Sequence, residues 1–218
     1  MMVKDSVKFS EYSQHLREVY SPVARDDTER IMEGIDALLS NSRSRAITTK
    51  AFLEDAMKLI YRLFDFREIA LGLKDRKDGL YRYEVILGYR KDSEAAYRQL
   101  VYKAEEMADS KKYPVGVYIS RYGEYSMIEG QPYKQGEEET YNRPLMLKKE
   151  RAAPDDFIEG DYIQIYFYGV KDDYLGWIEL SGPKSGKIPP RSTIKWIEFI
   201  AQIIGTVVYE REFKRPSA

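Results

Sequence analysis

Apolar side chains recur at helical spacing in two stretches near the N-terminus, residues 9–20 and 31–39. Positions three and four apart lie on one face of a helix, so this pattern predicts two helices. Asp26 and Asp27 precede the second stretch and supply a cap and a first-turn acid. The apolar stripe is too narrow for a core of its own, so it must dock on the rest of this chain or on a second chain.

A polar loop over residues 41–45 separates this part from the remainder. We therefore expect a helical extension over residues 1–45 and a domain over residues 46–218. The pattern of the domain predicts helices over 48–65, 92–110 and 192–213. It predicts strands over 81–89, 161–170 and 175–180, and short strands over 69–73, 115–119 and 145–148. This order is typical of an α+β domain in which helices pack on one face of an antiparallel sheet.

Alternation along the strand over residues 161–170 gives the two faces of the sheet different chemistry. One face is aliphatic, with Ile163 and Ile165, and the other is aromatic and polar. The aromatic and polar face carries Tyr162, Gln164, Tyr166, Trp177 and Glu179. We expect helices on the aliphatic face and the irregular segment 92–142 over the other face, which would make a small-molecule pocket of roughly several hundred cubic ångströms. The alternative is that the tyrosines line a solvated face.

The covering segment and its continuation supply further candidate ligand-binding residues. They are Tyr118, Tyr122, Tyr125, Tyr141 and Arg143. Arg143 would form a charge-assisted pair with a ligand that carries a carboxylate. Ordinary packing or a surface position is the alternative for each of these side chains.

The last predicted helix is apolar nearly all round between Ile194 and Val208. Such a helix is buried on two sides, of which the sheet covers one. The N-terminal helices, a second subunit or both can cover the other. We therefore predict a homodimer that forms through the terminal helices.

Composition excludes several classes of function. The chain has 218 residues with 35 Lys+Arg, 36 Asp+Glu, one His, no Cys and a net charge of −1. Without cysteine and with a single histidine there is no thiolate chemistry and no multi-histidine metal site, so we expect no metal and no cofactor. The balanced charge argues against nucleic-acid binding. A polar N-terminus and the lack of a long apolar run predict a cytoplasmic protein that does not enter a membrane.

Several short motifs are better explained as surface features. The segment 182–187 has too few residues between its glycines for a phosphate-binding loop. The acids between Asp155 and Asp161 lack the spacing of a calcium loop. The charged runs 137–139 and 148–151 are short and mixed or solvated, and His15 lacks the context of a phosphoacceptor. The 19 tyrosines are the one compositional hint of function, because tyrosine suits half-wet pockets and interfaces.

From residue 48 to residue 213 the sequence resembles the GAF domain family. The clearest parts are Phe157–Asp161 with the strand that follows, Leu175–Leu180, the Gly/Pro loop, and the helix containing Ile197–Gln202. The resemblance implies an antiparallel sheet with helices on one side and a ligand pocket on the other. It also implies regulatory sensing, dimerisation through terminal helices and, as a rule, no catalysis.

This sequence lacks the motifs of the named branches of that family. The Asn-Lys and Phe-Asp-Glu pattern of cyclic-nucleotide-binding members is absent, as are the cysteines of bilin carriers and of the methionine sulfoxide reductases, and a histidine for haem. We therefore expect a cytoplasmic, non-enzymatic sensor in signal transduction, with a small organic ligand that no motif names and a signalling protein as candidate partners. The alternative is a ligand-free interaction and dimerisation scaffold, which would expose an apolar patch beyond a few hundred Å².

Overall fold

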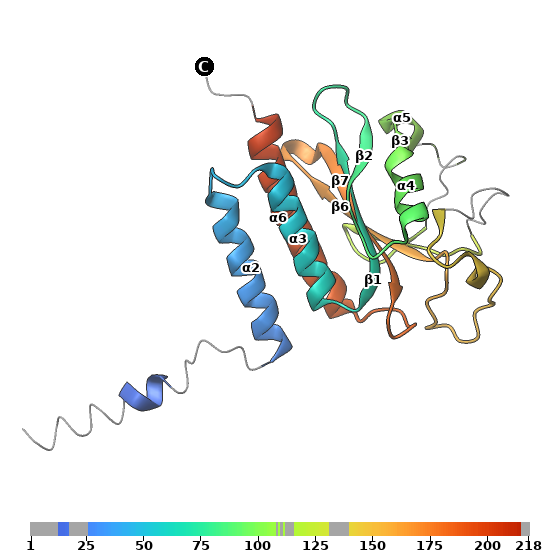
Figure 1. Ribbon diagram of the computed structural model, residues 1–218, viewed down its shortest axis with the longest axis horizontal. Helices are drawn as coiled ribbons and strands as arrows, with labels where there is room; N and C mark the ends of the chain where they lie inside the picture. The colour runs from blue at the N-terminus through green and yellow to red at the C-terminus, as the bar shows by residue number, and fades with distance from the viewer. Residues whose placement is uncertain are drawn as a thin grey trace, which may run out of the picture.

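The computed structural model describes residues 13–17, 26–107, 109, 111, 116–130 and 140–214. After a helical turn over residues 13–17, the elements are α2 (Asp27–Arg43), α3 (Thr49–Leu63), β1 (Phe66–Lys74), β2 (Tyr81–Leu87), α4 (Lys91–Gln99), β3 (Val101–Tyr102), α5 (Ala104–Met107), β4 (Val117–Tyr118), β5 (Gly123–Ser126), η2 (Pro144–Met146), β6 (Tyr162–Tyr168), η3 (Val170–Asp172), β7 (Tyr174–Pro183), α6 (Arg191–Val208) and η4 (Tyr209–Phe213). Helices α3 and α6 lie on one side of the sheet, and α4 and α5 lie on the other (Figure 1).

The strands form one antiparallel sheet in the order β3-β2-β1-β7-β6-β5-β4. The two hairpins that the sequence predicts, β1–β2 and β6–β7, lie side by side because β1 pairs with β7. This arrangement confirms the predicted α+β class and antiparallel sheet. The centre of the sheet is therefore built from strands more than 90 residues apart in the chain.

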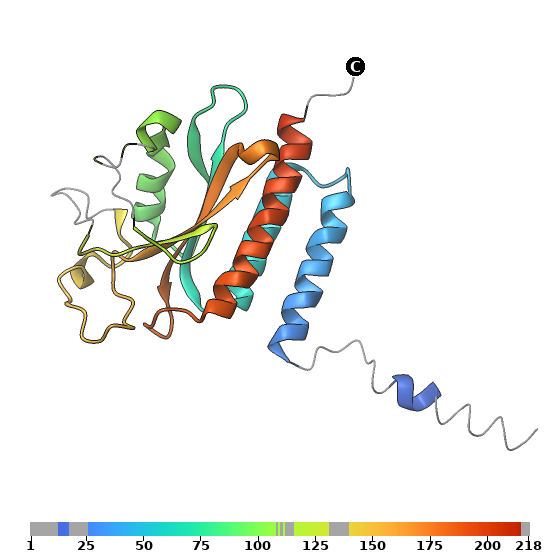
Figure 2. The same cartoon turned by 180° about the vertical axis from the view of Figure 1, so that it is seen from behind.

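The helices cover the aliphatic face, as predicted. Ile163, Ile165 and Phe167 are fully buried in one cluster with the apolar residues of α3 and α6. Helix α2 packs on the outside of these two helices (Figure 2). The stripe of α2 is buried in the same cluster, so it docks on its own chain. Asp26 caps α2 as expected, since its carboxylate accepts from the backbone N–H of Glu29 at 2.8 Å.

Two predicted elements of the region before β6 are wrong. The helix predicted over residues 92–110 ends at Gln99, and the chain then adds the edge strand β3. The buried residue of α4 is Ser93, whereas Ala95 is exposed. The strand predicted over 145–148 is a 3-10 turn that begins at Pro144, because proline fixes a turn-compatible φ and removes a donor from any ladder.

Strand β5 was missed and β4 is shorter than predicted. Gly123–Ser126 contains no β-branched residue, and Tyr125 is its only residue that strands favour, so its strand signal is weak. It becomes a strand because it pairs with β6, which offers a free edge. The last helix, α6, begins at Arg191 after Pro190, one residue before its predicted start. Within the described residues, no helix is both long and apolar enough to cross a membrane.

Candidate ligand-binding site

Trp177 anchors a second buried cluster on the aromatic and polar face of the sheet. This aromatic cluster consists of Ala70, Tyr81, Tyr83, Ile86 and Trp177. Trp177 is 1% exposed, and its ring centroid lies 5.4 Å from that of Tyr83 and 5.7 Å from that of Tyr102. Gly72 gives the indole its space, because a Cβ at that position would lie 2.3 Å from the Cζ2 atom of Trp177. Trp177, a predicted ligand-binding residue, is thus a core residue.

Glu179 lies two residues further along β7 and therefore points to the same face. Its carboxylate accepts hydrogen bonds from the hydroxyls of Tyr83 at 2.7 Å and Tyr97 at 2.8 Å, and Tyr89 approaches to 3.5 Å. The residue is 5% exposed. Burial raises the pKa of Glu179 above its ordinary 4.5, against the lowering effect of the tyrosine hydrogen bonds. Among the described residues no Lys or Arg forms an ion pair with it.

A row of polar side chains continues from Glu179 across the sheet. Glu179 pairs with Gln164 on β6, and Gln164 pairs with Glu124 on β5. The Tyr166 hydroxyl lies 2.8 Å from a carboxylate oxygen of Glu124 and 3.1 Å from the Gln164 amide oxygen. Burial raises the pKa of Tyr166, and the charge of Glu124 raises it further. The face is therefore acidic as well as aromatic.

A cavity of about 40 Å³ lies beside Glu179. Its walls are Glu68, Tyr89, Tyr97, Thr140, Tyr141, Asn142, Ile158, Glu159, Gly160, Asp161, Tyr162, Glu179, Ser181 and Gly182. This volume holds a few water molecules. On this face of the sheet the described residues leave less space than the several hundred cubic ångströms predicted, because the tyrosines of β2 and α4 pack there.

The segment 140–143 closes the cavity between α4 and β1. The Ser93 hydroxyl donates to the Tyr141 carbonyl at 2.9 Å. The Asn142 side chain accepts from the backbone N–H of Arg90 at 2.6 Å and donates to Glu68 at 2.8 Å. One short stretch thus joins the helix that covers the face to the sheet beneath it.

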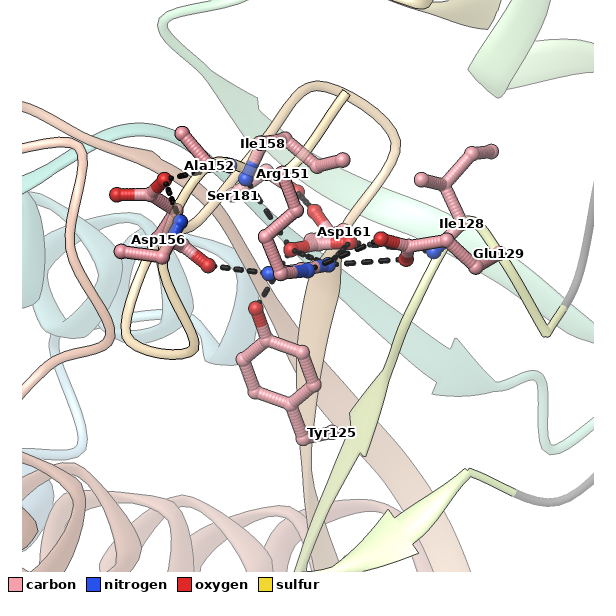
Figure 3. A network of polar contacts seen from close by, with 10 residues as sticks. Tyr125, Ile128, Glu129, Arg151, Ala152, Asp156, Ile158, Asp161 and Ser181 are labelled. Carbon is pink, nitrogen blue, oxygen red and sulfur yellow. Dashed lines mark hydrogen bonds and ion pairs between the residues drawn. The ribbon is translucent and has the colours of Figure 1, made fainter. Parts of the chain in front are cut away.

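Asp161 and Arg151 hold the loop that forms the other wall (Figure 3). The Asp161 carboxylate is fully buried and lies 2.9 Å from the Arg151 guanidinium. It also accepts from the Tyr125 hydroxyl at 2.6 Å and from the backbone N–H groups of Ile128 and Ile158, each at 3.1 Å. Because the donors come from three separate segments, this one carboxylate orders the loop.

The ten predicted site residues divide between the two faces and the sheet edge. Tyr162, Glu179 and Tyr141 line the cavity, while Gln164, Tyr166 and Trp177 share their face outside it. Tyr118 is 67% exposed on the edge strand β4. Tyr122 lies in the turn before β5, where its ring contacts that of Tyr168 on β6.

Two of those residues have partners that the sequence did not indicate. Tyr125 lies in the helix-side core against Phe157, because β5 is a strand of the sheet and not part of its cover. Arg143, expected to pair with a ligand carboxylate, pairs with the Glu159 carboxylate at 2.8 Å.

Sequence reasoning missed Tyr83, Tyr89, Tyr97 and Glu68. The reason for Tyr83 is a bulge: Leu71 pairs with Val85, but the next residue of β1 pairs with Tyr83. The extra residue in β2 interrupts the alternation of its side chains, so Tyr83 and Val85 point to opposite faces although they are two residues apart. Tyr97 lies four residues after Ser93 on the same face of α4, but serine is polar and only the tertiary structure shows that this face is buried.

The remaining motifs have structural or surface roles. Lys187, from the glycine-containing loop, forms ion pairs with Asp155 at 3.0 Å and Asp156 at 2.8 Å. His15 is exposed, and the run 137–139 lies outside the described residues. No group of three or more potential metal-ligating acids or histidines occurs in the part of the chain that the structure covers.

No protein-family model and no curated protein matches the sequence. Solved structures do match its fold. The GAF domain/HD domain protein from Geobacter sulfurreducens aligns with a TM-score of 0.54 at 11% identity, over 81% of this chain and 99% of that one. A methyl-accepting chemotaxis protein, residues 122–287, aligns at 0.50 with 6% identity over 84% and 99%. The Stigmatella aurantiaca phytochrome photosensory core module aligns at 0.50 with 13% identity over 87% and 38%. The chain therefore has a GAF-like fold.

The pKa shift of Glu179 predicts a pH-dependent difference between the wild type and Glu179→Gln. A carboxyl group whose pKa is raised by folding is destabilising once the unfolded chain ionises, so its contribution becomes unfavourable as pH rises above about 4.5. Glutamine cannot ionise and keeps the shape. In urea unfolding from pH 4 to pH 8, we expect the stability of Glu179→Gln relative to wild type to rise with pH.

The matched control is Glu84→Gln, at an exposed position of β2. Its difference from wild type should stay flat over the same range, since an exposed carboxylate loses little solvation on folding. A flat difference for Glu179→Gln as well would show that the buried carboxyl does not titrate differently in the folded protein.

Proposed function

We propose that this protein is a non-catalytic, cytoplasmic sensor module of signal transduction that binds a small molecule at the sheet face around Glu179. The observation that supports the proposal is the Glu179 carboxylate, buried on the face opposite the helix layer and held by tyrosine hydroxyls beside a small cavity. A buried charge is costly, and such groups concentrate at functional sites. The GAF-like fold and the sensory proteins that share it agree with this role.

Filling the cavity tests the proposal. Ser181 lines the cavity and is half-buried, so Ser181→Leu places an isobutyl group in its volume. We would incubate wild type and variant with a small-molecule extract of the producing cells and record native mass spectra. The expected result is a bound compound on the wild type that Ser181→Leu does not retain.

The matched control is Ser185→Leu, which makes the same change at an exposed position of the following turn. It should retain the compound like the wild type. If the wild type retains nothing, or if Ser181→Leu retains the same compound, the sensor assignment fails and the interaction scaffold becomes the better explanation.

We also propose that the protein acts as a homodimer through its terminal helices. Met32 on α2 is 57% exposed and Phe199 on α6 is 50% exposed, which leaves apolar side chains on the outer surface of the helix layer. The same native mass spectra report stoichiometry. A dimer that Phe199→Glu converts to monomer is the expected result, and a monomeric wild type at micromolar concentration would contradict it.

A further inference from the structure

The charges around the cavity do not cancel. Four carboxylates line it, those of Glu68, Glu159, Asp161 and Glu179, and no lining residue is basic. Arg143 neutralises Glu159 and Arg151 neutralises Asp161 from outside the walls. Within the described chain, Glu68 and Glu179 have hydrogen bonds but no ion pair. When Glu68 and Glu179 are ionised, the cavity therefore has an excess of negative charge.

The Tyr89 hydroxyl makes the longest of the tyrosine contacts to Glu179, whose carboxylate also has the Gln164 side chain as a hydrogen-bond partner. Tyr83 and Tyr97 donate at ordinary distances, one to each carboxylate oxygen. The third hydroxyl, from Tyr89, is 3.5 Å from the oxygen that Tyr97 also contacts. At that distance a hydrogen bond contributes little, so a stronger donor can replace it. Glu179, Tyr89 and Tyr97 all line the cavity, so such a donor would come from there.

Aromatic rings complete the walls. Tyr89, Tyr97, Tyr141 and Tyr162 line the same cavity as the acids. Tyrosine faces attract ammonium groups through the ring quadrupole, and the attraction is stronger in a desolvated site. An anion would meet repulsion from the carboxylates, and a neutral polar group would leave the charge excess in place.

We propose that the cavity beside Glu179 receives the ammonium headgroup of a small organic amine, which donates to the Glu179 carboxylate and packs against the surrounding tyrosine rings. This inference rests on the proposed sensor function and names the ligand class of that site. The volume of about 40 Å³ suits a headgroup of the size of methylammonium. Binding would neutralise a buried charge and draw α4, β1 and β7 together through one ligand.

Methylammonium chloride is the probe. It would be titrated into full-length protein with 13C-labelled tyrosine rings, with sodium chloride exchanged to keep the ionic strength constant. We expect saturable shifts of the Tyr97 and Tyr89 ring signals. Glu179→Gln should weaken binding about tenfold or more, because a charge-assisted hydrogen bond is lost. Glu84→Gln should bind like the wild type, and sodium acetate should shift nothing saturably.

A linear response to methylammonium, or equal binding by Glu179→Gln, would overturn the inference. If Glu179→Gln does not fold, Tyr89→Phe is the deciding variant, because it removes the long hydroxyl contact to Glu179 and keeps the ring. Methylammonium binding that is unchanged or tighter in Tyr89→Phe supports the inference. Loss of methylammonium binding in Tyr89→Phe refutes it. If the extract experiment with Ser181→Leu finds a neutral or anionic compound while methylammonium is inert, the ligand class is wrong and the sensor role stands. If both experiments find nothing bound, both proposals fail.

Discussion

Replacing Asp161 with alanine is expected to lower the free energy of unfolding by about 3–5 kcal/mol, the usual cost of breaking a buried ion pair. The carboxylate is fully buried, and its loss would leave Arg151 with only the half-exposed Glu129 as ion-pair partner. It would also leave the backbone donors of Ile128 and Ile158 without their acceptor. Urea unfolding followed by circular dichroism gives the measurement.

Asp155→Ala is the control for that prediction. Asp155 also forms an ion pair, with Lys187, but its side chain is 66% exposed. Exposed pairs contribute little, so the variant should unfold close to the wild-type midpoint. Similar losses for Asp155→Ala and Asp161→Ala would show that burial does not decide the role of Asp161.

The second large effect is expected for Trp177→Ala, which should also cost about 3–5 kcal/mol. The indole is 1% exposed and packs between the rings of Tyr81, Tyr83, Tyr102 and Tyr174. Removing it leaves a large void on the face of the sheet that carries Glu179. Thermal and urea unfolding both measure the loss.

Trp177→Phe distinguishes the contribution of ring packing to stability from that of the indole N–H group. The indole Nε1 is buried and finds no acceptor among the residues that the structure describes. Phenylalanine keeps most of the aromatic contact and removes that unpaired donor, so its cost should stay below about 2 kcal/mol. A loss as large as that of alanine would mean that the indole nitrogen makes a stabilising bond.

Strand alternation identified the two faces of β6 and β7 correctly from the sequence. Ile163 and Ile165 lie under the helices, and Tyr162, Gln164 and Glu179 lie on the opposite face. Side chains alternate strictly along a regular strand, so local sequence is sufficient there. The helices α2 and α3 were predictable for the same reason, because their apolar spacing and caps are local signals.

The partners of Glu179 were decided by tertiary structure. Tyr83 reaches it because a bulge shifts β2, and Tyr97 reaches it because α4 lies across the face (Figure 1). The volume of the cavity depends on how these large side chains pack, which no periodicity encodes.

The sequence by itself determined that this protein is a cysteine-free α+β domain with one aliphatic and one aromatic, polar sheet face. Composition and the two-residue alternation of apolar and polar side chains are properties of the sequence alone, so they can be read without knowing which strands pair. The pairing of β1 with β7, the placement of Tyr125 in the helix-side core and the enclosure of Glu179 were decided only in three dimensions. Each depends on contacts between residues far apart in the chain, whose free energy exists only once the sheet has formed.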